Sequence, residues 1–172
     1  MGGCSVLVLR IVFIVLTVMS MINTMAALYM PDWMSFNCFF NTCHVGLFRS
    51  CINSVCGEAS APSAKVTAVI VILSLLFQIG ALIYAICTYC IVKIATMFTP
   101  AGVLTGVGAF LNIVALVYWM TQAPSDYEMK EGNLLNSKTY SLHGMILSSI
   151  LLIVGSIIAM FVQHMIKTGR MK

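Results

Sequence analysis

The chain has 172 residues, of which 60% are hydrophobic and only 8% are charged, against about 25% charged residues in an ordinary soluble domain. So little charge leaves too little polar surface for a soluble fold. The formal net charge of +4 comes from scattered Lys and Arg residues and not from a basic cluster. Composition therefore excludes a soluble globular protein and argues against nucleic-acid binding, and the length suits a single membrane domain, residues 1–172.

Four segments are long and apolar enough to cross a bilayer, which requires about 20 predominantly apolar residues. They are residues 7–28, 66–92, 101–121 and 142–166. The third follows Pro100, a residue that is well tolerated where a helix starts. None of the four contains an acidic residue. We therefore expect a mainly α-helical membrane protein, built as a left-handed bundle of four helices.

The connectors predict how the chain is oriented. Residues 29–65 form the longest loop and hold four of the seven cysteines, at positions 38, 43, 51 and 56. Clustered cysteines are typical of an oxidising compartment, which favours an extracellular first loop. Residues 122–141 would then form a second extracellular loop, with both termini in the cytoplasm. Lys and Arg divide five inside and four outside, a slim margin in the expected direction. We expect a multi-pass protein of the plasma membrane.

The loop cysteines have spacings that suit local disulfides. Cys51 and Cys56 are separated by four residues, and a short antiparallel turn brings such a pair to bridging distance. Cys38 and Cys43 have the same spacing and are candidates for a second disulfide. Four cysteines allow three pairings, so crossed pairings stay open. Oxidation is favoured over a metal site because His44 is the only other ligand nearby, and we expect no metal.

Apolar and polar residues alternate in two parts of this loop, residues 33–37 and 45–51. This pattern is typical of strands with one buried face, so we expect a small antiparallel extracellular sheet over the helix ends. Trp33 and Phe48 should pack down at the membrane interface, where amphipathic aromatic residues are enriched. They are either interfacial anchors alone or part of a contact surface.

These residues resemble the signature of the claudin superfamily, a Trp followed by Gly-Leu-Trp and two cysteines. The matching positions are Trp33, Gly46, Leu47, Phe48, Cys51 and Cys56. The cysteine spacing is closer to the branch of peripheral myelin, epithelial membrane and lens fibre membrane proteins than to true claudins. The chain departs from the signature at Phe48, where the family has Trp. It also ends Arg170-Met171-Lys172, unlike the claudin endings that bind PDZ scaffolds, so we expect no PDZ partner.

The resemblance implies a function without catalysis or a cofactor. Members of this superfamily mediate cell–cell contact or organise junctions through the disulfide-tied first extracellular loop. The implied partners are membrane lipid and other membrane proteins, including further copies of the chain on the same or an apposed cell. The alternative from the same resemblance is an auxiliary subunit or modulator of a membrane channel or receptor.

A second cysteine feature, Cys87-x-x-Cys90, lies near the inner end of the second predicted helix. A C-x-x-C pair is typical of redox proteins, and small four-helix enzymes of the vitamin K epoxide reductase type combine such a pair with loop cysteines. The bilayer would separate the two cysteine groups by about 30 Å, which argues against thiol exchange between them. Palmitoylation of Cys87 and Cys90 and plain packing are the alternatives.

Small residues recur at a spacing of four in two of the predicted helices. Gly102 and Gly106 open the third, and Gly144 and Ser148 open the fourth. Such spacing lets helix backbones approach closely in a bilayer, where no hydrophobic effect drives helices together. We expect these positions to pack helices within the bundle, with packing between subunits as the alternative.

Overall fold

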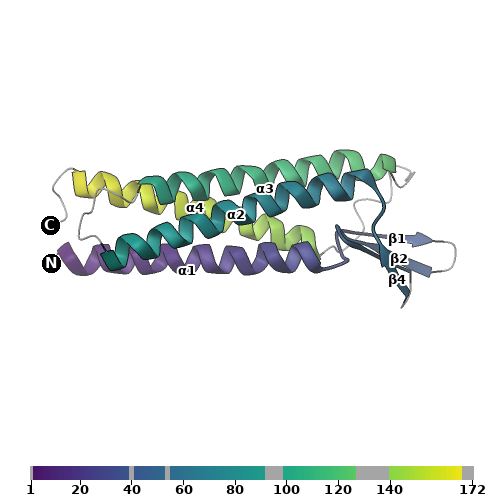
Figure 1. The fold of residues 1–172 in the computed structure, drawn as a ribbon, viewed down its shortest axis with the longest axis horizontal. Coiled ribbons are helices and arrows are strands. Elements are labelled where there is room, and N and C mark those ends of the chain that lie inside the picture. The colour runs from purple at the N-terminus through teal and green to yellow at the C-terminus, as the bar shows by residue number, and fades with distance from the viewer. Residues whose placement is uncertain (1, 39–40, 53–54, 92–98, 127–139, 168–172) are drawn as a thin grey trace.

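The computed structural model describes residues 2–38, 41–52, 55–91, 99–126 and 140–167. Four long helices, α1 (Gly2–Tyr29), α2 (Pro62–Ile91), α3 (Thr99–Asp126) and α4 (Tyr140–Lys167), run side by side. A small sheet lies at one end of the bundle, while α1 begins and α4 ends at the other (Figure 1). Within the described residues, these four helices are long and apolar enough to cross a membrane.

The helices are longer than the apolar segments that predicted them. The third predicted helix stops at residue 121, yet α3 continues through Pro124 to Asp126. The second begins not at residue 66 but at Pro62, where proline costs no helical hydrogen bond. Asp126 helps to define both ends, because its Oδ2 accepts a hydrogen bond of 2.9 Å from the Ser63 backbone N–H. That N–H has no partner within its own helix.

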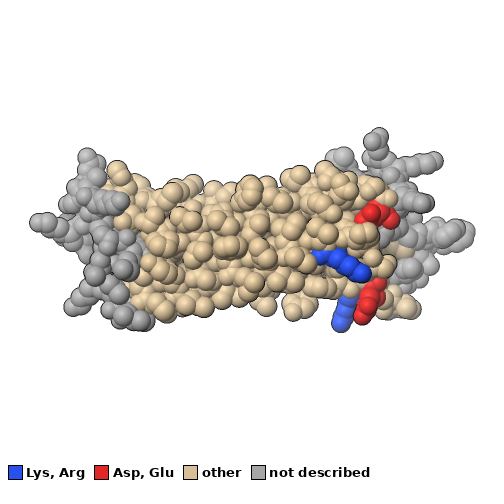
Figure 2. All heavy atoms as spheres, turned by 45° about the horizontal axis from the view of Figure 1, so that its top comes forward, with Lys and Arg blue, Asp and Glu red and all other residues tan. Residues whose placement is uncertain are grey.

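The bundle is inverted in polarity relative to a soluble protein. Each helix packs chiefly against two others, α1 and α3 both lying against α2 and α4. Large apolar side chains point outward from every helix, for example Val15, Leu76, Phe110 and Ile157. Figure 2 shows one side of the molecule on which the described residues present charged side chains at the sheet end and an uncharged surface along the middle of the bundle. An apolar exterior of this kind fits a lipid solvent.

The interior of the bundle contains a buried polar cluster to which all four helices contribute. Ser148 Oγ of α4 lies 2.7 Å from Ser20 Oγ and 2.7 Å from Thr24 Oγ1, both of α1. Asn112 Nδ2 of α3 donates to Ser148 Oγ at 3.2 Å, and Gln78 Nε2 of α2 donates to Thr24 Oγ1 at 3.3 Å. All five side chains are buried. We refer to Ser20, Thr24, Gln78, Asn112 and Ser148 as the polar cluster.

Two of the predicted small packing positions lie where helices approach closely. A Cβ atom added at Gly102 would lie 2.9 Å from Ala159 Cβ, and one added at Gly106 would lie 3.3 Å from Ser156 Oγ. Both contacts are between α3 and α4 within one chain. Gly144 faces the Asn23 carbonyl oxygen of α1 with a wider separation of 3.8 Å. The fourth predicted position, Ser148, acts through its hydroxyl group in the polar cluster.

The sheet has four antiparallel strands in the order in which they occur along the chain. They are β1 (Met34–Cys38), β2 (Asn41–Val45), β3 (Arg49–Ile52) and β4 (Val55–Glu58). The predicted strand at residues 45–51 is wrong as one element. The chain turns there, because the Gly46 N–H donates 2.8 Å to the Arg49 carbonyl oxygen and closes a tight loop between β2 and β3.

Candidate functional site

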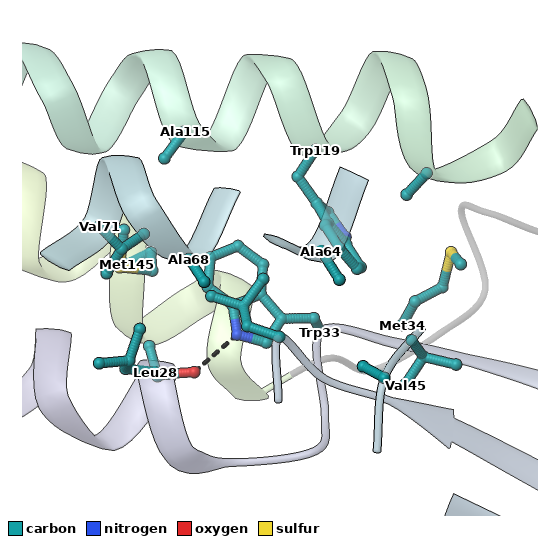
Figure 3. Close-up of a cluster of buried hydrophobic side chains, with 14 of the residues drawn as sticks. Leu28, Trp33, Met34, Val45, Ala64, Ala68, Val71, Ala115, Trp119 and Met145 are labelled. Atoms are coloured by element: carbon teal, nitrogen blue, oxygen red, sulfur yellow. Dashed lines mark hydrogen bonds between the residues drawn. The ribbon is translucent and has the colours of Figure 1, made fainter. Parts of the chain in front are cut away.

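The sheet is attached to the bundle through Trp33, which is fully buried just before β1. Its indole Nε1 donates a hydrogen bond of 2.6 Å to the carbonyl oxygen of Ala27 in the last turn of α1 (Figure 3). Carbonyl groups in the last turn of a helix lack partners within that helix. The buried indole of Trp33 therefore also caps the C-terminal end of α1. This contact fixes the position at which the sheet begins.

Trp119 of α3 is the second large side chain in this seat. The Trp33 and Trp119 rings meet edge to face, with centroids 5.4 Å apart and planes at 66°. Alanine residues give the two rings room: Ala64 and Ala68 share one face of α2, and Ala115 and Ala123 lie one turn on either side of Trp119. Figure 3 shows Ala64, Ala68 and Ala115 around the indole rings. We call Trp33, Trp119 and the side chains packed on them the tryptophan seat.

The Gly46-Leu47-Phe48 motif forms the turn that lies beside this seat. A Cβ atom at Gly46 would come within 2.6 Å of Pro31 Cα and 2.7 Å of the Met30 carbonyl oxygen, so only glycine fits. Leu47 is buried in the same hydrophobic cluster as Trp33. The motif therefore combines a close backbone approach with one side chain that joins the core.

The predicted role of Trp33 as an anchor at the membrane interface is wrong, because protein encloses its ring completely. Trp33 is a core residue that connects α1, α3 and the sheet. Phe48 differs: 43% of its surface is exposed, and its ring centroid lies 6.3 Å from that of Tyr29 at the end of α1. Of the two aromatic positions, Phe48 is the one that an interfacial environment can reach.

A disulfide ties the last two strands together. Cys51 of β3 and Cys56 of β4 are direct partners across the strand pair and form the bond predicted from their spacing. Cys43 of β2 is buried and disulfide-bonded. The side chain of its predicted partner, Cys38, lies outside the described residues. Among the described residues, no group of three His, Cys, Asp or Glu side chains is placed to hold a metal ion.

Strand β4 forms one edge of the sheet and leaves its outer side unpaired by the described strands. All four of its residues are exposed, and Val55 exposes 76% of its surface. An unpaired edge of this kind can accept a strand from another chain. The sheet thus has a fastened side, at Trp33 and Leu47, and an open side at β4.

The C-x-x-C pair lies far from the sheet. Cys87 carries an exposed free thiol, and the side chain of Cys90 lies outside the described residues. Cys87 is 25 residues beyond Pro62, the residue at which α2 leaves the sheet end. At about 1.5 Å per residue, this distance is roughly 37 Å. Thiol exchange between Cys87 and the sheet cysteines of one chain is therefore excluded. Palmitoylation of Cys87 and Cys90 stays a prediction.

Sequence reasoning missed Trp119 and the full set of partners in the polar cluster. Trp119 could have been found from Ala115 and Ala123, which flank it at helical spacing and mark one face of α3 as tightly packed. Gln78 and Asn112 were recognisable as rare polar residues within apolar segments. Their hydrogen-bond partners on other helices were not, because those partners depend on how each helix is rotated.

The tryptophan seat, the tied turn and the open β4 edge define the candidate interaction site. No model of a known protein family matches the chain, and no curated protein matches it either.

Proposed function

We propose that this chain is a non-catalytic, multi-pass protein of the plasma membrane that makes contact with neighbouring membrane proteins through its four-stranded sheet. The observation that supports this function best is the asymmetry of the sheet. One side is fastened to the bundle by the Trp33 indole, which donates to Ala27. The other side presents strand β4, in which every residue is exposed and which the Cys51–Cys56 disulfide ties to β3. A rigid, open edge suits binding to a strand of another chain.

The proposed orientation places the sheet outside the cell and both termini in the cytoplasm, with the helices as a left-handed bundle across the bilayer. Two observations support it. The disulfides of the sheet suit an oxidising compartment. The sheet also lies at the end of the bundle opposite to the start of α1 and the end of α4 (Figure 1). An extracellular sheet then requires cytoplasmic ends for these helices.

The resemblance of Trp33, Gly46, Leu47, Cys51 and Cys56 to the claudin signature supports contact between cells as the setting. In the structure these residues build the seat, the turn and the tie of one small sheet. These signature residues determine how the sheet is attached to the helix bundle. A fixed attachment suits a protein whose outer loop must bind its partner in one orientation. The partner is then another membrane protein, including a second copy of this chain on an apposed cell.

The proposal can be tested with the Val55→Lys variant expressed at the surface of cells that otherwise do not aggregate. A lysine on an exposed edge strand opposes pairing with another strand. We expect the wild-type chain to promote aggregation of suspended cells and to be captured by a membrane-impermeant cross-linker, and Val55→Lys to lose both effects at equal surface level. Ser60→Lys is the control. Ser60 is exposed just beyond β4, so this substitution adds the same charge outside the strand.

Mixing expressing and non-expressing cells separates the two settings of the proposal. Aggregates that contain only expressing cells indicate contact between copies on apposed cells. Cross-links to another protein on the same cell, without aggregation, indicate an auxiliary subunit. If Val55→Lys promotes aggregation and is cross-linked to the same extent as the wild type, the open edge is not the contact surface.

A further inference from the structure

An open groove lies where the sheet meets the side of α2, and it borders the tryptophan seat at Leu47 and Ala68. Its volume is about 840 Å³. One wall comes from the turn and strands β3 and β4, including Phe48, Arg49 and Glu58, and the other comes from α2, including Lys65, Val69 and Ile72. The groove therefore combines three charged side chains with an apolar floor.

The floor continues along one face of α2 toward the middle of the bundle. Lys65, Val69 and Ile72 are spaced by four and three residues, so they share one face of the helix. Val69 exposes 59% of its surface, and Leu76, one further turn along, also exposes 59%. From Lys65 to Leu76 the helix rises roughly 16 Å. This length is close to half of the ~30 Å hydrocarbon core, which is the depth of one leaflet.

The charged residues all lie at the sheet end of this apolar face. Arg49 on β3 and Lys65 on α2 are both exposed and both line the groove. Within the part of the chain that the structure describes, neither forms an ion pair within 4.0 Å. Glu58 is the strand partner of Arg49 across β3 and β4. Figure 2 shows basic and acidic side chains of the described residues gathered at this end, beside the uncharged surface of the middle of the bundle.

We propose that this groove binds one phospholipid with a zwitterionic headgroup. Its phosphodiester accepts charge-assisted hydrogen bonds from Arg49 and Lys65, its cationic end faces Glu58, and one acyl chain follows Val69, Ile72 and Leu76. Arginine and lysine are the side chains suited to a phosphate. The adjoining apolar face suits an acyl chain, which a free phosphate lacks. This lipid site goes beyond the proposed contact function. The contact function is tested at Val55, which does not line this groove, so the two proposals can fail separately.

The test is native mass spectrometry of the full chain in detergent, titrated with defined lipids. We expect one bound dioleoylphosphatidylcholine at concentrations where dioleoylglycerol, which lacks the phosphate, and inorganic phosphate do not bind. Dioleoylphosphatidylglycerol should bind more weakly than the choline lipid, and Glu58→Gln should reduce that preference. Arg49→Gln combined with Lys65→Gln should weaken binding of the choline lipid by at least about tenfold, as expected for two charged hydrogen bonds.

Two matched controls separate this site from general solvation by lipid. Val69→Trp fills the groove and should abolish the bound lipid, whereas Val103→Trp adds the same ring at an exposed position of α3 and should not. Arg10→Gln removes a positive charge near the start of α1, the end that lies away from the sheet, and should leave binding unchanged.

Three outcomes would overturn the proposal. Equal binding of dioleoylglycerol and dioleoylphosphatidylcholine would indicate lipid solvation only. Unchanged binding in both the Arg49/Lys65 double variant and Val69→Trp would remove the site. A dimer mass in place of bound lipid, lost in Val69→Trp, would show that a second copy of the chain occupies the groove. In each case the aggregation test of Val55→Lys would still decide the proposed contact function separately.

Discussion

The tryptophan seat and the polar cluster are both buried, but different interactions stabilise them. The seat consists of indole rings among alanines, with one hydrogen bond from Trp33 Nε1 to the end of α1. The polar cluster consists of hydroxyl and amide groups that bond to one another between helices, centred on Ser148. One region is held by shape and apolar surface, and the other by hydrogen bonds.

The difference follows from the solvent that each region would meet if it opened. A helix inside a bilayer gains nothing by moving apolar surface away from lipid, so close packing and hydrogen bonds must associate the helices. The sheet end meets water, where burying an indole is strongly favourable. On the proposed orientation, the chain thus places its largest aromatic contacts at the water-facing end and its hydroxyl and amide groups deeper in the bundle.

The largest effect is expected for Trp33→Ala. This change removes a fully buried ring and leaves the Ala27 carbonyl oxygen without its indole partner. Truncating a buried Trp costs about 3–5 kcal/mol. If the sheet depends on this seat, amide hydrogen exchange in β1, β2 and β3 should accelerate by more than about a hundredfold, while exchange in the middle of the helices changes little.

Trp33→Phe separates the ring from its hydrogen bond. It keeps most of the apolar surface but removes the indole N–H, and an unpaired buried carbonyl costs about 1–3 kcal/mol. Exchange in the strands should therefore rise less than in Trp33→Ala. Equal rates for the alanine variant and the wild type would show that the sheet is held by something other than the tryptophan seat.

A smaller effect is expected for Gly46→Ala, within the same region. The added methyl group would collide with Pro31 Cα and the Met30 carbonyl oxygen, which are backbone atoms and cannot rotate away. Overpacking of this kind costs about 1–3 kcal/mol. Strand exchange or the thermal midpoint of sheet unfolding in detergent measures the loss.

Gly57→Ala is the matched control for this glycine. Gly57 lies on the exposed strand β4, and nothing is within 4 Å of an added Cβ atom. It should leave the sheet as stable as in the wild type. If both variants lose equal stability, glycine content and not the close approach at Gly46 would explain the effect.

The features that the sequence predicted are those that depend on local pattern. Four apolar runs predict four helices because crossing a bilayer sets a minimum length. Alternation and closely spaced cysteines predict a small tied sheet, and Cys51 and Cys56 are direct strand partners as their spacing suggests. The end of the third helix was placed too early and the start of the second too late, because apolar length ignores capping, as the bond between Ser63 and Asp126 illustrates.

The features that escaped prediction depend on contacts between distant parts of the chain. Residues 45–51 alternate like a strand, but the approach of Gly46 to Pro31 requires a turn there. Trp33 looks interfacial until Trp119, 86 positions later, closes over it. Ala115 and Ala123 mark the face of Trp119 as tightly packed, but nothing around Gly46 or Trp33 identifies the distant partner of either residue. Both contacts can be predicted only once it is known how each helix is rotated about its axis and how the sheet packs on the bundle.

The smallest effect is expected in the polar cluster, and it distinguishes hydrogen bonds between helices from hydroxyl groups in general. Ser148→Ala removes the group that contacts Ser20, Thr24 and Asn112. Hydrogen bonds between membrane helices contribute about 0.6 kcal/mol each on average, so the variant should lose about 1–2 kcal/mol. Unfolding of the helices in mixed micelles titrated with a denaturing detergent measures this loss.

The next residue along α4 provides the control. Ser149 is also buried, but among the described residues its hydroxyl donates to the Met145 carbonyl oxygen of its own helix, at 2.8 Å, and to no other helix. Ser149→Ala should change the unfolding free energy little, because that carbonyl already accepts the helical backbone bond. A loss confined to Ser148→Ala would show that bonds between helices hold the bundle where apolar packing alone cannot. An equal loss of unfolding free energy in the two variants would instead show that packing, and not hydrogen bonds between helices, stabilises the polar cluster. The contrast with the tryptophan seat would then disappear.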